Sequence, residues 1–186
     1  MVSDKVSDVA DQGFPEGDED RFWGLVEAAW APLGPEAGRA RQALARRTPD
    51  SGSDLYEDPA LILVQDKLKE FLANLSTLCR DLTADELVSL DRVAERKLYD
   101  IDRADVQAVT DGSDDGFLYA RGFIVALGRE FYEAVVRDPE MAVLDGECEA
   151  MCYFFAHLHA ARFGSFPDTG SAISRESCSN PTGWPS

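Results

Sequence analysis

The sequence predicts an all-α fold, a compact bundle of about six or seven helices with disordered N- and C-terminal tails. Three observations support this prediction. Apolar residues recur with a 3.6-residue period over about five turns from Pro59. Thr83-Ala84-Asp85-Glu86 has the pattern of a capping box, and a long apolar-periodic segment runs from Asp114 to Asp138-Pro139. No segment shows the sustained alternation of a half-buried strand.

The N-terminal part of the chain divides into a tail, two helices and a loop. Residues 1–17 are polar and acidic, which predicts a disordered tail. A helix is expected over 18–31, because acidic residues at its start suit the positive end of a helix and apolar residues follow at helical spacing. A short Ala- and Arg-rich helix is expected over 36–47, and residues 48–59 have the composition of a loop.

Three further helices are expected in the middle of the chain. The first starts at Pro59. The second starts at the capping box, where the Thr83 hydroxyl accepts a hydrogen bond from a free N–H of the first turn and the Glu86 carboxylate accepts one from the N–H of the cap residue. This second helix is expected to end near Tyr99. One or two helical turns follow over 102–109. The apolar face of the first helix consists of Leu61, Val64, Leu68, Phe71, Leu72, Leu75 and Leu78.

The segment after Gly112 is expected to form the centre of the bundle. Ser113 or Asp114 caps a helix whose crowded apolar positions continue to residue 137. A short helix is expected over 140–144 and a final one over 147–163.

Length and composition favour one folded domain, over residues 18–163. Residues 164–186 are rich in Ser, Thr, Gly and Pro, which predicts a mobile tail.

The chain is strongly acidic, with a formal net charge of −17 and a pI near 4.3. Such a surface repels nucleic acid and anionic lipid headgroups, so neither a nucleic-acid nor a membrane partner is expected. It would suit a basic protein partner, and solubility alone explains it equally well. The composition does not fix an oligomeric state.

The four cysteines are expected to be reduced and the protein cytoplasmic. The first fifteen residues have no apolar signal segment, and no run approaches the roughly 18 apolar residues of a membrane span. Two cysteines share a helix with His157 and His159, but this arrangement does not bring four ligands from separate elements together. We therefore expect no metal and no cofactor. The cysteines are Cys79, Cys148, Cys152 and Cys178.

Three segments carry a shared set of motifs: DEDRFWGLVEAAW (18–30), LTADELVSLDRVAERKLYDID (82–102) and DGSDDGFLYARGFIVALGREFYEAVVRDPEMA (111–142). Together they resemble a family of uncharacterised bacterial proteins, the domain of unknown function DUF4240. The resemblance covers residues 18–163 and implies an all-helical domain, without known catalytic residues. The chain departs from the family pattern at 103–110, where the family has a Trp- and Tyr-rich segment before a double Gly.

The turn before the central helix has two interpretations. Asp111, Ser113 and Asp115 resemble the start of a calcium-binding loop, but the twelfth position, which needs a bidentate Glu, holds Gly122. A solvated turn in which Ser113 or Asp114 caps the helix is the simpler interpretation, and a weak cation site is the alternative.

Charged residues inside the apolar central helix are candidates for ion pairs or for ligand binding. Arg129 and Glu133 are spaced for an i,i+4 pair. Arg121 and Arg129, with Asp114 and Asp115, are the candidate partner- or ligand-binding residues of this helix. The sequence contains no recognisable set of catalytic residues and no phosphate-binding glycine loop.

Trp23 and Trp30 lie seven residues apart on the first helix and are expected in the core. A partly exposed Trp30 would suit a hot spot for a protein partner.

The C-terminal tail surrounds one cysteine with hydroxyl residues. This pattern resembles the core of a ribosomally made peptide whose Ser and Thr are dehydrated and crosslinked, although disordered tails are also commonly rich in Ser. The residues that would be modified are Ser171, Ser174, Ser177, Cys178, Ser179 and Thr182.

Three functional hypotheses follow. The first is a non-enzymatic, acidic module that binds another protein, as an antitoxin, immunity factor or regulator, through an exposed acidic face with an aromatic centre. The second is a peptide precursor with the folded domain as leader and residues 171–186 as core. The third is a small enzyme, with a pocket between the central and last helices that Arg121, Arg129 or Asp115 lines.

Overall fold

A computed structural model gives the fold of the chain and describes residues 17–49, 55–110 and 112–184. These residues form α-helices and short 3₁₀ turns, and none of them is in a strand. The all-α prediction is therefore confirmed. The predicted N-terminal tail and Asp111 of the calcium-loop pattern lie outside the described residues, apart from Gly17.

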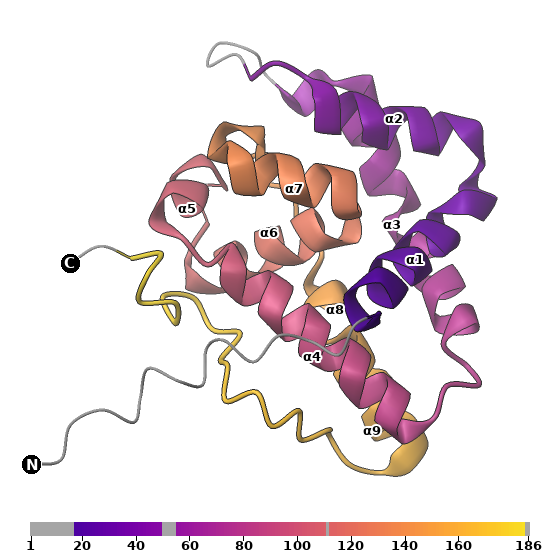
Figure 1. Ribbon diagram of the computed structural model, residues 1–186. Helices are drawn as coiled ribbons and strands as arrows, with labels where there is room; N and C mark the ends of the chain where they lie inside the picture. The colour runs from indigo at the N-terminus through magenta and orange to yellow at the C-terminus, as the bar shows by residue number, and fades with distance from the viewer. Residues whose placement is uncertain (1–16, 50–54, 111, 185–186) are drawn as a thin grey trace, which may run out of the picture.

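The helices follow one another with short connections (Figure 1). Three 3₁₀ turns, at Ala31–Leu33, Leu55–Glu57 and Pro139–Met141, lie between them in the described residues. The α-helices are α1 (Asp18–Trp30), α2 (Gly34–Arg46), α3 (Pro59–Leu78), α4 (Ala84–Asp100), α5 (Ala104–Thr110), α6 (Asp114–Ala126), α7 (Arg129–Arg137), α8 (Glu149–Cys152) and α9 (Phe154–Phe163).

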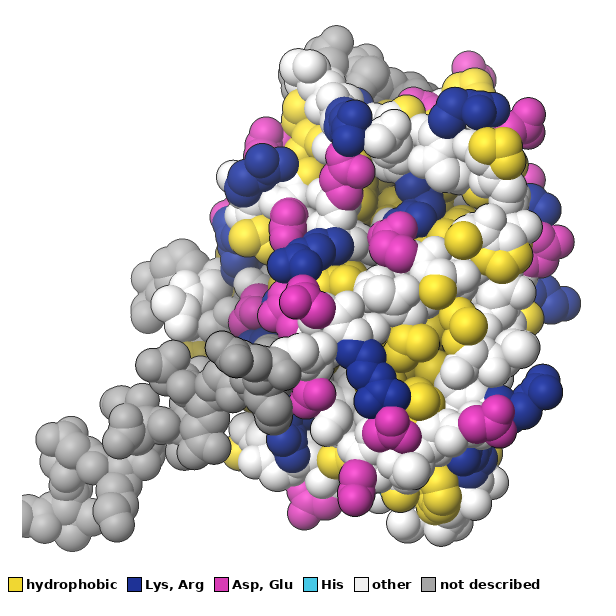
Figure 2. Space-filling model, turned by 45° about the vertical axis from the view of Figure 1, so that its right-hand side comes forward, with side chains coloured by type: hydrophobic (Ala, Val, Ile, Leu, Met, Phe, Trp, Pro, Cys, Tyr) yellow, Lys and Arg dark blue, Asp and Glu magenta, His cyan; other side chains and the backbone are white. Residues whose placement is uncertain are grey.

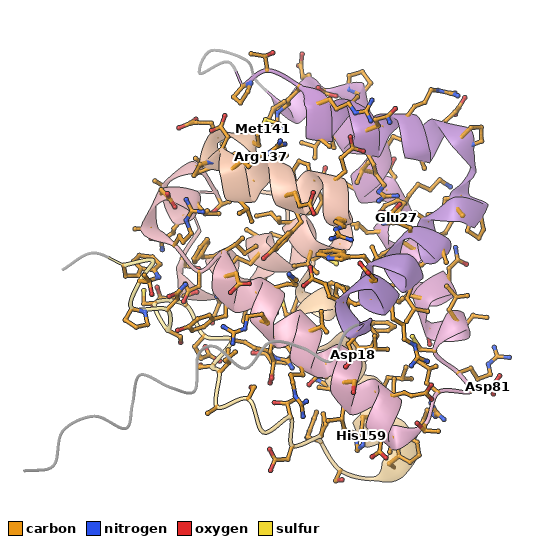
Figure 3. The ribbon with its side chains drawn as sticks, viewed as in Figure 1. Asp18, Glu27, Asp81, Arg137, Met141 and His159 are labelled. Carbon is orange, nitrogen blue, oxygen red and sulfur yellow. The ribbon has the colours of Figure 1, made fainter. Side chains whose placement is uncertain are left out.

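Helix α6 is the centre of the bundle, as its apolar pattern predicts. It packs against α4, α7 and α8, while α1, α2 and α3 form the other side of the core. Helix α9 packs against α4, and Figure 3 shows His159 beside the N-terminal end of α4. Most positions of α6 are buried on all sides: Phe117, Leu118, Ala120, Arg121, Gly122, Phe123, Ile124, Val125 and Ala126.

Local signals set several helix ends. The capping box at the start of α4 is present, with the Thr83 hydroxyl accepting from the Glu86 N–H and the Glu86 carboxylate accepting from the Thr83 N–H at 2.7 Å. Asp58 caps α3 by accepting from two N–H groups of its first turn. Ser113 caps α6, which is one of the two residues predicted for that role.

The helix predicted over 114–137 is two helices, because the chain turns at Gly128. Gly128 has φ +94°, a conformation that residues with a Cβ rarely adopt. A Cβ there would also collide with Arg41 and Glu27, which pack against this turn from α2 and α1. The break lets α7 lie against α2 instead of continuing along the axis of α6.

Two other boundaries differ from the prediction. The final helix is divided at Tyr153 into α8 and α9, and it begins at Glu149 rather than at residue 147. The short helix expected over 140–144 is only the 3₁₀ turn Pro139–Met141, which the Asp138 side chain caps.

The C-terminal tail makes contacts that the sequence did not predict. Residues 164–184 have no helix or strand, as their composition predicts, but they lie against the helices. Thr169, Arg175 and Asn180 of this segment are buried. The composition gave no sign of this packing because polar side chains, rather than an apolar face, make the contacts.

Among the described residues, no helix has the length and apolar character that a membrane-spanning helix requires. On the face drawn in Figure 2, acidic and basic side chains are interspersed between hydrophobic ones. The acidic face with an aromatic centre is not found on this side.

We predict that Gly128→Ala destabilises the protein by more than about 1 kcal/mol, because alanine at a positive φ is strained and its Cβ has no room. Gly24→Ala is the matched control. Gly24 lies inside α1 with no atom within 4 Å of the added Cβ, so alanine there should stabilise the protein by about 0.5–1 kcal/mol. Urea unfolding of both variants measures these changes. Equal effects of the two substitutions would contradict the explanation.

Candidate functional site

The C-terminal segment, residues 164–184, occupies a polar groove along α4. Figure 1 shows the segment running beside α4 from the end of α9 towards α5. Side chains of α4 and α6, the Asp102 side chain in the turn after α4 and the Cys152 carbonyl at the end of α8 contact it. We call this surface the α4–α6 groove and define it by Asp91, Glu95, Asp102, Asp114, Arg121 and Cys152.

Arg175 is one of the three buried residues of the segment, with Thr169 and Asn180. Its guanidinium lies 2.6 Å from Asp91 and 3.2 Å from Glu95, donates to the Cys152 carbonyl, and stacks over the ring of Tyr153 at 5.3 Å. The side chains of Arg175 and Asp91 are 8% and 2% exposed. Such a pair is costly to break, because either charge would remain buried without its partner.

The titration of this pair reflects both burial and charge. Burial raises the pKa of Asp91, and the charge of Arg175 opposes that shift. For Arg175, burial works to lower the pKa, but the charges of Asp91 and Glu95 outweigh it and the pKa is raised. Asp91 Oδ1 has no hydrogen-bond partner among the described residues.

Glu95 holds the first part of the segment through two hydroxyls. Thr169 and Ser171 donate to the same carboxylate oxygen at 2.6 and 2.8 Å. Arg92, one turn before Glu95, donates to the Thr169 carbonyl at 2.7 Å. Helix α4 therefore binds both the side chains and the backbone of the segment.

Asp102 binds the last part of the segment. It follows the C-terminus of α4, is fully buried, and accepts the backbone N–H groups of three consecutive residues at 2.7–3.0 Å. Trp184 donates its indole N–H to the same carboxylate at 3.0 Å, and its ring meets Phe117 edge-on. Successive backbone N–H groups that converge on one anion form a specific anion site. The three N–H donors are Cys178, Ser179 and Asn180.

Arg121 lies beneath the segment between these two anchors. It is 0% exposed and stacks on Phe117 at 4.8 Å. It donates to the carbonyls of Leu98 and Arg175 at 3.0 and 2.9 Å and to the Ser177 hydroxyl at 3.2 Å. Burial lowers its pKa, against the charge of Asp102.

The structure brings together several residues that the sequence predicts as binding or tail residues. Ser177 donates to the Asp114 carbonyl at 2.6 Å and accepts from Arg121. The Ser174 hydroxyl and the Thr182 N–H make contacts within the segment itself.

Asp115 and Arg129 lie outside the α4–α6 groove. Arg129 pairs with Glu133 at 2.8 Å, as its spacing predicts, and with Asp20 at 2.9 Å. It lines a different cleft of about 440 Å³, together with Glu27, which Figure 3 shows on α1. Arg121 contacts the C-terminal segment instead, so the two arginines lie at different sites.

Trp23 and Trp30 are buried, so neither forms an exposed hot spot. The exposed fractions of the two residues are 3% and 2%. Trp30 stacks on Phe71 at 4.8 Å and donates to the Ala126 carbonyl at 2.8 Å, and Trp23 packs edge-on against Phe22. Both tryptophans lie in the core, as expected. The alternative of a partly exposed Trp30 is wrong, because α1 packs closely on α3.

The sequence interpretation missed Asp91, Glu95, Asp102 and Arg175 as site residues. Asp91 did carry a signal, since it lies four residues after Leu87 and seven before Leu98 on the apolar face of α4. A carboxylate in that position requires a buried partner.

Cys148 and Cys152 are buried in the core, as predicted, and Cys152 donates to the Leu118 carbonyl. The described residues contain no group of three or more His, Cys, Asp or Glu side chains arranged to hold a metal ion.

The family described as "Protein of unknown function (DUF4240)" matches residues 60–159. The chain belongs to this family. No curated protein and no solved structure matches the chain. All six residues that define the α4–α6 groove lie within the part that matches DUF4240, whereas the C-terminal segment lies after it.

We predict that iodoacetamide modifies one thiol of the native protein at pH 8, that of Cys178. Cys178 is exposed, whereas Cys79, Cys148 and Cys152 are buried, and burial raises their pKa to about 11, 11 and 12. The thiolate is the reactive form, so both access and charge protect these three. Mass spectrometry of the intact protein should show one adduct, none in Cys178→Ser, and four after denaturation. Modification of native Cys152 would contradict the packing of Arg175 over the end of α8.

Proposed function

We propose that this DUF4240 protein is a non-enzymatic protein-binding module whose α4–α6 groove binds an extended, basic segment of a partner protein. The supporting observation is that the groove already holds an extended segment of the chain, with Arg175 between Asp91 and Glu95 and three backbone N–H groups on Asp102. Main-chain contacts with one specific side-chain site are a recurring mode of peptide recognition.

The charges of the groove favour a basic partner. Apart from the segment, its walls contribute the carboxylates of Asp91, Glu95 and Asp102 against the guanidinium groups of Arg92 and Arg121. The net charge of −17 adds a long-range attraction for a basic protein, which raises the rate of association. An antitoxin, immunity factor or regulator in the cytoplasm would use these properties.

The C-terminal segment would regulate this binding by competition. A segment joined to its own groove has an effective concentration of roughly millimolar. A partner at lower concentration must therefore have a higher affinity for the groove than the segment has in order to displace it. The groove would thus be closed to weak, unspecific basic peptides and open to a matching one.

The precursor hypothesis requires that the same segment be accessible to an enzyme. Its hydroxyls must reach a modifying enzyme, and Ser171 and Ser177 are held on Glu95 and on the Asp114 carbonyl. Modification would therefore require release of the segment. Water losses that map to residues 171–186 in protein from its own host would support this alternative.

A labelled peptide with the sequence of residues 168–186 tests the proposed function. We predict that full-length Arg175→Ala binds it at least about tenfold more tightly than the unsubstituted protein, because the competing segment has lost its buried ion pair, worth about 3–5 kcal/mol. Fluorescence anisotropy under reducing conditions measures the affinity.

Two controls define the site of binding. A peptide with Ala in place of Arg175 should bind weakly. The further substitution Asp102→Asn in the protein should also weaken binding, because the side-chain amide would place its own N–H donors against the backbone N–H donors of the segment. Failure of Arg175→Ala to bind the peptide while it stays folded, as judged by circular dichroism, would refute the proposal.

A further inference from the structure

Arg121 is a buried charge without an acidic partner in direct contact. It is 0% exposed, and it takes part in none of the ion pairs found among the described residues. Its hydrogen bonds go to two carbonyls and one hydroxyl, and its Nε has no partner in the described part of the chain. A buried guanidinium is costly unless it is paired and fully hydrogen-bonded, so this position is unsatisfied in its present state.

The unsatisfied edge of Arg121 adjoins the C-terminal segment. Nη1 is bound to the Leu98 carbonyl of α4, whereas Nη2 contacts the Arg175 carbonyl and the Ser177 hydroxyl. Nε and Nη2 form one edge of the planar guanidinium, the kind of edge that binds a carboxylate through two parallel hydrogen bonds. Ser177 supplies a single neutral oxygen to it, at 3.2 Å.

Positions 175 and 177 of the segment both face the domain. Arg175 enters the site of Asp91 and Glu95, Ser177 contacts Arg121, and Glu176 between them is exposed. A segment bound in this way therefore presents two side chains, two residues apart, to groove sites of opposite charge.

We infer that the α4–α6 groove selects a partner segment with an arginine followed two residues later by an aspartate or glutamate, and that Arg121 is the residue that binds this acidic side chain. The inference rests on the proposed function and specifies its ligand. The protein's own segment has the arginine but a serine at the second position, so it is the weaker occupant. A partner with both side chains displaces it.

The other groups around position 177 oppose part of this gain. An acidic side chain there cannot donate to the Asp114 carbonyl as Ser177 does, and Asp102 and Glu176 are close enough to act on Arg121 through space. An arginine and a carboxylate can form two parallel charge-assisted hydrogen bonds, where Ser177 now accepts a single one from Arg121. The balance favours the acid.

Peptide binding to full-length Arg175→Ala tests the inference. Three peptides with the sequence of residues 168–186 are compared by anisotropy: the unsubstituted one, Ser177→Asp, and the isosteric neutral control Ser177→Asn. We expect Ser177→Asp to bind about tenfold more tightly than Ser177→Asn, and we expect this difference to disappear when the protein also carries Arg121→Gln. Equal affinity of the two substituted peptides would overturn the inference and leave the proposed function intact, whereas no binding of any peptide would remove both.

If a groove variant does not fold, the unfolding temperature of full-length variants at position 177 tests the inference instead. In the otherwise unsubstituted protein, Ser177→Asp should unfold at a higher temperature than Ser177→Asn, because the acid pairs with Arg121 within the molecule. Ser174→Asp, at an exposed position of the same segment, should have no such effect relative to Ser174→Asn. A lower unfolding temperature for Ser177→Asp than for Ser177→Asn contradicts the inference.

Discussion

The carboxylate of Asp102 joins the helical domain to the chain that follows it. It is fully buried, and the four hydrogen bonds that it accepts from described residues come from residues 178–184. A buried carboxylate left without donors carries a large desolvation cost, so the turn after α4 requires something in the groove. The position of residues 178–180 and the environment of Trp184 both depend on this contact.

The interface between segment and helices differs from the core in its chemistry. The core is made of aromatic and aliphatic side chains, such as the stacked pair Trp30 and Phe71. The segment instead binds through carboxylates, guanidinium groups, hydroxyls and backbone amides. A polar interface of this kind depends on geometry more than on area, and water can satisfy many of its groups when it opens. It therefore suits reversible and selective binding.

Sequence reasoning succeeded where the deciding interactions are local. The capping box of Thr83 and Glu86 and the apolar period of α3 involve residues three to seven apart, and both were found as predicted. The break at Gly128 was missed because the apolar pattern continues across it, and the direction that α7 takes after Gly128 depends on its packing against α2, from another part of the chain.

The candidate site was only partly predictable for the same reason. Arg121 stood out as a charge in an apolar helix, but its neighbours come from far along the chain. Arg175 is 84 residues from Asp91, and Asn180 is 78 residues from Asp102. A polar segment carries no periodic signal for such contacts, since each depends on where the folded helices place a single carboxylate.

The order of these elements along the chain has a consequence for synthesis. The walls of the groove are made by residues up to Tyr153, and the segment that fills it follows. Because chains are made from the N-terminus and domains fold as they emerge, the helices can complete the groove before its own occupant is available. For that interval the newly made protein would offer an empty, acidic groove, and a partner of the proposed kind would meet it without competition.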